Sequence, residues 1–497
     1  MKKAKVVASV ATVTVFGIFT RIISFVFKIY LSRTLGAEAI GLYQIAVSVF
    51  YLFASLSASG IPLVLSRKTA ENLALNKNND FDLLTSALLI GVVLSISISA
   101  ILALFNTRLA FLVSDPNAYP VFLIMIPALL STSIYSVLRA WLWGKRQFSA
   151  FSATETAEEM LRILFSVLFL SGIISGIAGV YAVALAFTVS DVVVAIILFV
   201  IFFIKGGKLQ KPTKIKEILL PSLPITAMRV FSGLIGTLIA LILPLRLVAF
   251  GMSPSEATAS YGRIAGMANP LLFAPNAIIG SLAIVLVPEM SANGAKKDYA
   301  TLNRHLTSGI NFSFLICGLF LVVYLALGTE ITSILYKDTV SGEYLKYAAF
   351  LMLPMNLMQL TNSALNSIGK EPRAFINYII GNVFLIVAII ILPKYVGIYS
   401  VAVATMLSTV TTSLLNVYAL RKTTGLSYSF VKYLIYAIVL ALPCAFASDC
   451  VIDLLGDGII TVIFAAVCGG AIYCIFCFAT DLVDIGGFLK LRRARVQ

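Results

Sequence analysis

The sequence predicts an all-α polytopic membrane protein with about fourteen transmembrane helices. Three observations predict this class. Apolar residues make up 60% of the 497 residues, charged residues only 12%, and the mean hydropathy is +1.00, whereas a soluble domain is about half apolar and about a quarter charged. The apolar residues form separate runs of about 20 residues or more, the length that crosses a bilayer. Basic residues gather in alternate connections between these runs.

The spanning runs follow one another along the whole chain. Lys2, Lys3 and Lys5 precede the first run, which has full spanning length and lacks a small-residue cleavage site, so we expect a retained helix and no cleavable signal peptide. In order, the runs lie near residues 6–31, 41–65, 83–112, 119–143, 157–174, 177–204, 218–249, 262–288, 306–334, 345–368, 373–392, 396–420, 430–448 and 459–480.

An even number of spans places both termini on one side of the membrane. Most of the 37 Lys and Arg residues fall in segments on the side of the N-terminus, including the stretch 205–217 (KGGKLQKPTKIKE). The positive-inside rule makes this side the cytoplasm of a multi-pass cell (inner or plasma) membrane protein. The same rule explains the net charge of +15 without a nucleic-acid partner. The lysines of 205–217 could also bind anionic membrane lipids.

An internal repeat is indicated by two similar octapeptides, GVYAVALA at Gly179–Ala186 and GIYSVAVA at Gly397–Ala404. The repeating unit holds six helices, so its two copies have the same orientation and are related by a pseudo-twofold axis along the membrane normal. Such folds bind their substrate between the repeats. The predicted organisation is an N-lobe (1–204), a cytoplasmic linker (205–217), a C-lobe (218–425), and two further helices with a basic tail (426–497).

Ionisable residues inside spans are functional candidates because their burial in lipid is costly. Arg21 and Lys28 lie two turns apart on one face of the first helix, and Arg229 lies inside the seventh. Arg263 opens the eighth helix and could instead reach the outer interface. The tenth helix carries a polar row that could bind substrate or join helices: Gln359, Asn362 and Asn366.

Acidic residues are scarce in the predicted spans. Asp191 is the one clear acidic group deep in a span, where it could be the counter-ion of a buried arginine or a proton or cation coupling site. Arg139 and Arg162 could extend to the cytoplasmic interface. A cavity with net positive charge suits an anionic substrate, and the arginine fork suits phosphate oxygens.

The first helix and its exit carry a recognisable motif: TRxxxF at Thr20–Phe25, SRTLG at Ser32–Gly36 and GLYQ at Gly41–Gln44. It resembles the polysaccharide-transporter branch of the MOP superfamily, most of all the Gram-positive lipid II flippases and the stage V sporulation protein B group. The resemblance implies a two-lobe, alternating-access flippase for a lipid-linked glycan pyrophosphate, in peptidoglycan or other cell-wall biosynthesis or in sporulation. It also implies that Arg21 lines a cationic cavity and that Arg33 lies near its exit.

Departures from this branch leave the substrate open. Relatives carry a further arginine where this sequence has Phe27-Lys28, and the basic residue that some have in the second helix is absent. The substrate could be the peptidoglycan precursor lipid II or another lipid-linked polysaccharide unit. A multidrug-type cation antiporter of the same superfamily is the alternative. Expected partners are the anionic lipid-linked glycan and membrane lipids, with cell-wall synthesis proteins as further candidates.

Enzymatic chemistry lacks support in the sequence. His305 is the only histidine, and Asp80-Phe81-Asp82 is a short acidic triplet that often arises by chance. Cys474 and Cys477 lie in an apolar run, where cysteine acts as a small hydrophobic residue. No nucleotide-binding motif or metal-spaced cluster occurs, so we expect no enzyme activity, cofactor or metal, and transport driven by gradients.

Overall fold

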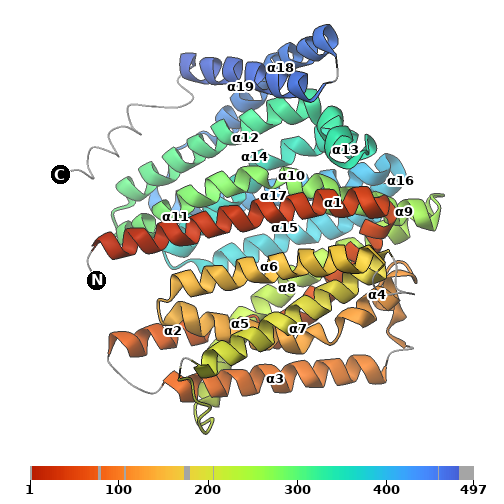
Figure 1. Ribbon diagram of the computed structural model, residues 1–497. Helices are drawn as coiled ribbons and strands as arrows, with labels where there is room; N and C mark the ends of the chain where they lie inside the picture. The colour runs from red at the N-terminus through yellow and green to blue at the C-terminus, as the bar shows by residue number, and fades with distance from the viewer. Residues whose placement is uncertain are drawn as a thin grey trace. The chain divides into compact units, whose positions relative to one another are not determined.

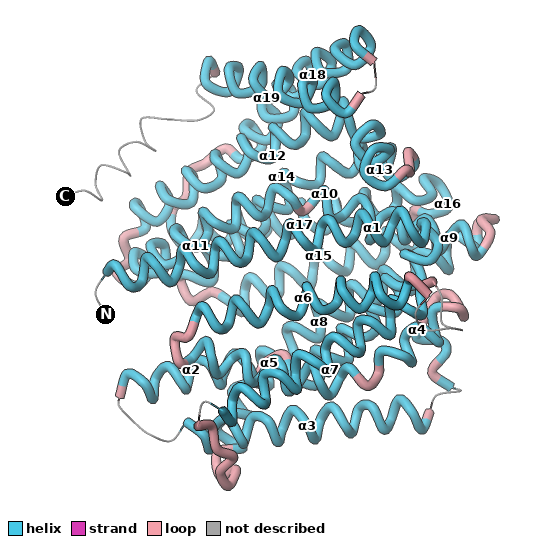
Figure 2. Tube along the Cα trace, in the orientation of Figure 1, coloured by secondary structure: helices cyan, strands magenta, loops and turns pink. Residues whose placement is uncertain are grey.

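The computed structural model describes residues 3–75, 80–105, 108–172, 179–204, 206–456 and 458–480. In these residues the regular structure is helical and no strand occurs, which confirms the predicted all-α class (Figures 1 and 2). The chain forms two compact units, Met1–Gly262 and Arg263–Gln497.

The first unit consists of long helices joined by short connections. Its elements are α1 (Lys3–Ala58), α2 (Ile61–Ala74), α3 (Asp80–Leu104), the short 3-10 helix η2 (Ala110–Leu112), α4 (Ala118–Met125), α5 (Ala128–Gly144), α6 (Phe148–Leu170), α7 (Val180–Ile204), α8 (Ile215–Ala249) and α9 (Pro254–Gly262).

The bend in α1 is made by a glycine. Gly36 has φ +80° and ψ 173°, a conformation that only glycine adopts without strain. The 56 residues of α1 would extend about 84 Å if straight, far more than a bilayer of about 30 Å. Figure 1 shows the red helix turning back at this bend. The first two predicted spans therefore lie on the two arms of α1, the second continuing into α2.

Helix α8 packs closely on α1 and α2 through small residues. The Thr237 hydroxyl donates to the Ser48 carbonyl over 3.0 Å, and the Gly60 amide donates to the Thr226 hydroxyl over 3.2 Å. A Cβ on Gly60 would come within 2.3 Å of the Ser222 carbonyl oxygen. The first compact unit consequently extends beyond the stretch 205–217. The lobe boundaries based on the repeat stay a prediction.

The segment before α8 is held against α3. The Asp82 carboxylate accepts hydrogen bonds from the Thr213 amide (2.8 Å) and hydroxyl (2.5 Å), and the Thr85 hydroxyl accepts one from the Gln210 amide (3.1 Å). The second acid of the Asp80–Asp82 triplet therefore anchors the connection to α8.

The second unit begins with η3 (Arg263–Ala268), which is a π-helix, and ends with two helices packed on α12. Its further elements are α10 (Asn269–Leu272), α11 (Ala274–Ala295), α12 (Tyr299–Tyr336), α13 (Val340–Ala348), the 3-10 helix η4 (Ala349–Leu351), α14 (Met352–Ser367), α15 (Glu371–Ile391), α16 (Pro393–Val396), the 3-10 helix η5 (Gly397–Tyr399), α17 (Ser400–Thr424), α18 (Phe430–Leu455) and α19 (Ile459–Ala479). Gly318 of α12 leaves room for the Tyr473 ring of α19.

The two units share one turn geometry. At the end of α5 the Arg146 amide donates to the Trp143 carbonyl and the Gln147 amide to the Leu142 carbonyl, both over 2.9 Å. At the end of α14 the amides of Gly369 and Lys370 make the same pair of bonds, over 3.1 and 2.9 Å. The same pair of bonds also ends α8 and α11, so it does not distinguish a repeat, and both the repeat and the pseudo-twofold arrangement stay predictions.

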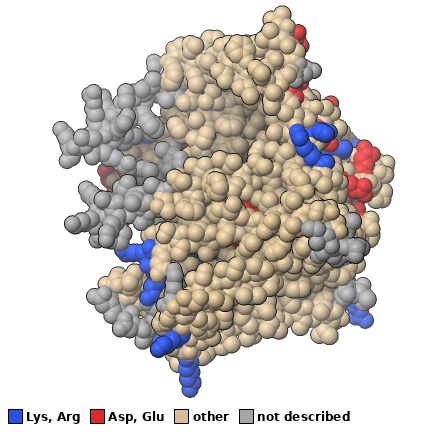
Figure 3. Space-filling model, in the orientation of Figure 1, with Lys and Arg blue, Asp and Glu red and all other residues tan. Residues whose placement is uncertain are grey.

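The helices have the length and surface of membrane spans. Within the described residues nine helices are long and apolar enough to cross a membrane, or ten if α4 and α5, bent by 47°, form one span. Large apolar side chains such as Phe446 (71% exposed) and Ile460 (80% exposed) lie on the surface. The face in Figure 3 is almost entirely uncharged between its edges. The protein is a multi-pass membrane protein, and the count of fourteen crossings stays a prediction.

Candidate functional site

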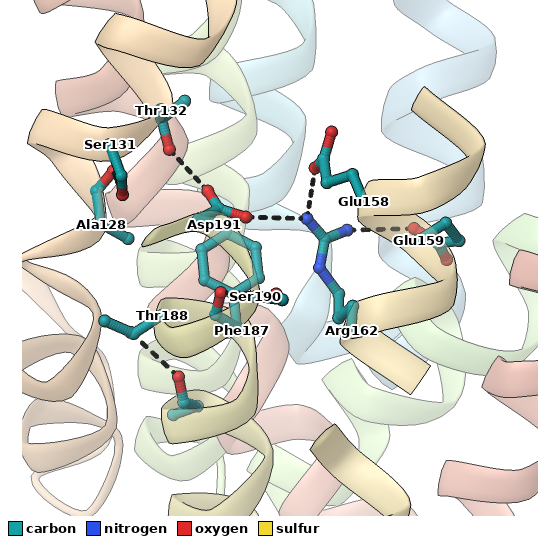
Figure 4. A network of polar contacts seen from close by, with 11 residues as sticks. Ala128, Ser131, Thr132, Glu158, Glu159, Arg162, Phe187, Thr188, Ser190 and Asp191 are labelled. Atoms are coloured by element: carbon teal, nitrogen blue, oxygen red, sulfur yellow. Dashed lines mark hydrogen bonds and ion pairs between the residues drawn. The ribbon is translucent and has the colours of Figure 1, made fainter. Parts of the chain in front are cut away.

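A buried polar network of the first unit surrounds Arg162 on α6. Its guanidinium donates to Glu158 over 2.5 Å and to Glu159 over 3.1 Å, one turn earlier on the same helix. It also reaches Asp191 of α7 over 3.1 Å, and the other oxygen of Asp191 accepts a hydrogen bond from Thr132 of α5 over 2.7 Å. Figure 4 shows the guanidinium between the three carboxylates. We call these four charged residues the Arg162 network.

The Arg162 network is shielded from solvent. Side-chain exposure is 14% for Arg162, 20% for Glu158, 14% for Glu159 and 7% for Asp191. The Phe187 ring lies 4.7 Å from the guanidinium carbon, which adds a cation–π contact. Three carboxylates around one guanidinium leave this network with an excess of negative charge.

A second ion pair joins α5 to α6. Arg139 of α5 pairs with Glu155, and its guanidinium stacks 4.0 Å from the Phe151 ring. Arg139 and Arg162 are both bound by carboxylates of α6, and the expectation that they extend to the cytoplasmic interface stays a prediction. Asp191 is paired with Arg162, as the counter-ion alternative required, whereas its coupling role stays a prediction.

Three further acidic residues belong to α6. The run predicted at 157–174 is part of a helix that begins at Phe148, so Glu155, Glu158 and Glu159 lie within α6. The placement of Asp191 as the one clear acidic group deep in a span stays a prediction. The spacing of Glu158 and Glu159 from Arg162, four and three residues, was the sequence signal for an ion pair on one helix face.

The first arm of α1 lies along α6. The hydroxyls of Thr20 and Thr156 are 2.8 Å apart, and Phe27 and Leu31 are buried in a cluster that includes Ile163. Lys28 is half-buried on this arm.

Two of the predicted basic residues are exposed and uncompensated. Arg21 on α1 and Arg229 on α8 both have exposed side chains, and neither has an ion-pair partner in the part of the chain that the structure describes. Both lie well inside long apolar helices. These two guanidinium groups remain available for an anionic ligand.

Arg263, at the start of the second unit, is already neutralised. It pairs with Asp338 over 2.8 Å, and the other oxygen of Asp338 accepts a hydrogen bond from the Ser341 amide at the start of α13. Both side chains are largely buried, 22% and 14% exposed. The pair ties η3 to α13, so Arg263 contributes less free positive charge than the sequence suggested.

The polar row of α14 divides into two parts. Gln359 and Asn366 are exposed. Asn362 accepts a hydrogen bond from Asn416 of α17 over 2.7 Å, and Asn416 accepts one from Asn377 of α15 over 2.9 Å. Asn362 therefore joins helices, whereas substrate binding by the exposed Gln359 and Asn366 stays a prediction.

The predicted site residues are thus distributed over both units. Arg21, Lys28, Arg229 and Asp191 lie in the first, and the remaining predicted residues lie in the second: Arg263, Gln359, Asn362 and Asn366. The shared cavity that would unite them stays a prediction. Among the described residues no group of three His, Cys, Asp or Glu side chains is arranged to hold a metal ion.

Comparisons with known proteins point to one group of transporters. The polysaccharide biosynthesis protein family matches residues 6–294. Stage V sporulation protein B of Bacillus subtilis (strain 168) is 24% identical over 456 residues, which cover 88% of this chain and 87% of that protein.

Solved structures share the fold. The lipid II flippase MurJ in its inward closed conformation gives a TM-score of 0.77 at 16% identity, covering 95% of this chain and 99% of that one. An inward-facing multidrug resistance MATE family transporter of the MOP superfamily gives a TM-score of 0.70 at 15% identity, covering 82% of this chain and 94% of that one.

Proposed function

Because this chain belongs to the polysaccharide biosynthesis protein family and has the fold of MOP-superfamily transporters, we propose that it is a flippase for a lipid-linked glycan pyrophosphate. The proposed substrate is the peptidoglycan precursor lipid II, carried from the inner to the outer leaflet by alternating access. Both termini are proposed to be cytoplasmic, in accord with the distribution of Lys and Arg.

The observation that carries this proposal is the pair of uncompensated arginines. Arg21 and Arg229 lie within helices of membrane-spanning length, where a charge facing lipid is costly. An anionic ligand would remove that cost. The planar guanidinium binds two phosphate oxygens at once, which a lysine ammonium does not. A pyrophosphate, with several such oxygens, matches two separate guanidinium groups.

The exposed amides of the second unit suit the other part of the substrate. Gln359 and Asn366 each offer both donors and an acceptor, and sugar hydroxyls need both. Their exposure within a helix that carries a buried apolar face supports contact with a polar ligand.

A membrane potential can drive this transport without nucleotide. Moving negative charge out of an inside-negative cell releases about 2.3 kcal/mol per charge per 100 mV. A pyrophosphate with about two charges therefore gains roughly 4–5 kcal/mol at about 100 mV.

One observation favours a second candidate function, a cation antiporter. Glu155, Glu158, Glu159 and Asp191 provide four carboxylates in the first unit, and such groups attract cationic drugs and coupling ions. These carboxylates are engaged by Arg139 and Arg162, however, whereas Arg21 and Arg229 have no ion-pair partner among the described residues. We therefore rank the anionic substrate first.

The test compares Arg21→Ala and Arg21→Lys in proteoliposomes with fluorescent lipid II. Loss of one charge-assisted contact, about 1.5–3 kcal/mol, predicts roughly ten- to hundredfold weaker binding for Arg21→Ala, with partial retention in Arg21→Lys. Arg67→Ala, at an exposed pair with Glu71 on α2, is the matched control and should behave as wild type. Unaltered flipping in Arg21→Ala, or transport of a cationic drug in place of lipid II, would contradict the proposal.

A further inference from the structure

The non-helical segment between α7 and α8, residues 206–214, is fixed at both of its ends. We call this segment the strap. At its start, the amides of Gly206 and Gly207 donate to the carbonyls of Phe203 and Phe202, both over 2.9 Å. A Cβ on Gly207 would lie 2.4 Å from the Phe202 ring, so the chain leaves α7 closely packed on the end of that helix.

The other end of the strap is bonded to the first turns of α3. Asp82 and Thr85 accept the hydrogen bonds described above, and the Ser86 hydroxyl accepts one more from the Lys214 amide, over 3.1 Å. Because three of these bonds come from backbone amides of the strap, they fix its main chain on α3 and leave its lysine side chains outside the contact.

This contact places the strap at the membrane surface. The apolar part of α3 runs from Phe81 to Leu104 and is long enough to cross a bilayer. Thr85 and Ser86 lie one turn inside this part, about 6–8 Å along the helix axis from Phe81. The headgroup layer of a bilayer is roughly 5–8 Å thick. The strap therefore lies beside the stretch of α3 that passes through the headgroups.

The exposed side chains of the strap suit this depth. Lys208 and Lys211 are exposed, and Leu209 between them in the sequence is 50% exposed. Ile204, at the end of α7, is 79% exposed. A lysine at this level keeps its ammonium among the phosphates while apolar side chains reach the acyl chains. Figure 3 shows basic side chains along the lower edge of the molecule, where Figure 1 draws the loop that precedes α8.

The acids beside the strap are already engaged. Glu217, at the start of α8, pairs with Lys214 over 2.7 Å and with Lys68 over 3.4 Å. The α3 carboxylate is occupied by the hydrogen bonds from the strap. Lys208 and Lys211 have no ion-pair partner in the part of the chain that the structure describes. Their charges are therefore available to an anion in the headgroup layer.

We propose that the strap is a preformed binding site for an anionic phospholipid, in which Lys208 and Lys211 bind the headgroup phosphate and Leu209 contacts the acyl chains. The hydrogen bonds to α3 position the strap and do not touch the lipid. The site does not depend on which solute the protein transports. Each lysine near an anionic surface strengthens binding roughly fivefold, so loss of both should weaken it roughly 20- to 30-fold. High salt should reduce this difference by screening.

The first experiment titrates the purified full chain, in a neutral detergent, with phosphatidylglycerol, and native mass spectrometry counts the bound lipids. Lys208→Gln with Lys211→Gln should weaken the binding of one lipid by the factor given above. The control, Lys296→Gln with Lys297→Gln, removes the same charge from an exposed turn between α11 and α12 and should bind as wild type does. An equal loss in both double variants, or no loss in the strap variant, overturns the proposal.

A second variant separates a preformed site from a general effect of charge. Asp82→Ala removes two of the hydrogen bonds that hold the strap and, at the same time, one negative charge beside it. A preformed site predicts weaker binding of phosphatidylglycerol, whereas attraction by net charge alone predicts tighter binding. Tighter or unchanged binding in Asp82→Ala therefore overturns the proposal.

Two further ligands test the chemistry of the partner. Phosphatidylcholine, which has no net charge, should bind equally to wild type and to the strap variant. Free glycerol phosphate carries the same anionic group without acyl chains and should not displace phosphatidylglycerol. Displacement by glycerol phosphate, or a loss of phosphatidylcholine in the strap variant as large as that of phosphatidylglycerol, would refute an anionic membrane lipid as the ligand.

Discussion

Arg162→Met tests whether the Arg162 network stabilises the first unit. The substitution keeps a long apolar side chain but leaves Glu158, Glu159 and Asp191 without their common partner, at side-chain exposures of 7–20%. Breaking a buried ion pair from one side costs about 3–5 kcal/mol. The lost contact with the Phe187 ring adds about 0.5–2 kcal/mol. Because such contributions overlap, we expect a total loss of about 3–5 kcal/mol in the free energy of unfolding.

Unfolding in mixed micelles with increasing denaturing detergent measures this loss. Arg67→Met is the matched control, because the Arg67–Glu71 pair is also within one helix but is 73% and 55% exposed, and should cost about 0–1 kcal/mol. Arg162→Lys keeps the charge but not the fork, so it should recover part of the loss. Acidification should lessen the defect of Arg162→Met by protonating the unpaired carboxylates. If Arg162→Met costs no more than Arg67→Met, the network does not stabilise the unit.

Two further predictions concern the second unit and the topology. Asn416→Ala removes the hydrogen bonds to Thr361, Asn362 and Asn377 and should lower the free energy of unfolding by about 2–4 kcal/mol in the same assay. The control Asn366→Ala, at an exposed position, should change it by no more than about 0.5 kcal/mol. Equal effects of the two substitutions would contradict a helix-joining role for Asn416. Lys211→Cys on a cysteine-free background should resist a membrane-impermeant thiol reagent applied to intact cells, and efficient labelling there would reverse the predicted orientation.

Composition and hydropathy were sufficient to predict the fold class. A chain that exposes Phe446 and Ile460 satisfies its backbone polar groups in lipid only through helices or closed barrels, and runs of about 20 apolar residues select helices. The resemblance of the Thr20–Gln44 segment to the polysaccharide-transporter branch is confirmed by the family match. Hydropathy did not show that two predicted spans join at Gly36 without an intervening loop, because that bend depends on one backbone conformation.

The helix that contains most of the predicted run 157–174 begins earlier than the run, at Phe148. Hydropathy ends a span where charges gather, and Glu155, Glu158 and Glu159 lie just before and at the start of the apolar run. In the folded unit these charges face Arg139 and Arg162, so the helix continues through them to Phe148. Charge neutralisation between neighbouring helices depends on the tertiary structure, which a hydropathy scale of single residues does not describe.

This charge neutralisation also limits which basic residues are free for the proposed anionic ligand. Six basic residues were placed inside predicted spans, yet Arg139, Arg162 and Arg263 each bind a carboxylate. The positive charge proposed to attract a ligand is the charge left after these pairs, and on exposed side chains of the first unit's spanning helices it lies on Arg21 and Arg229.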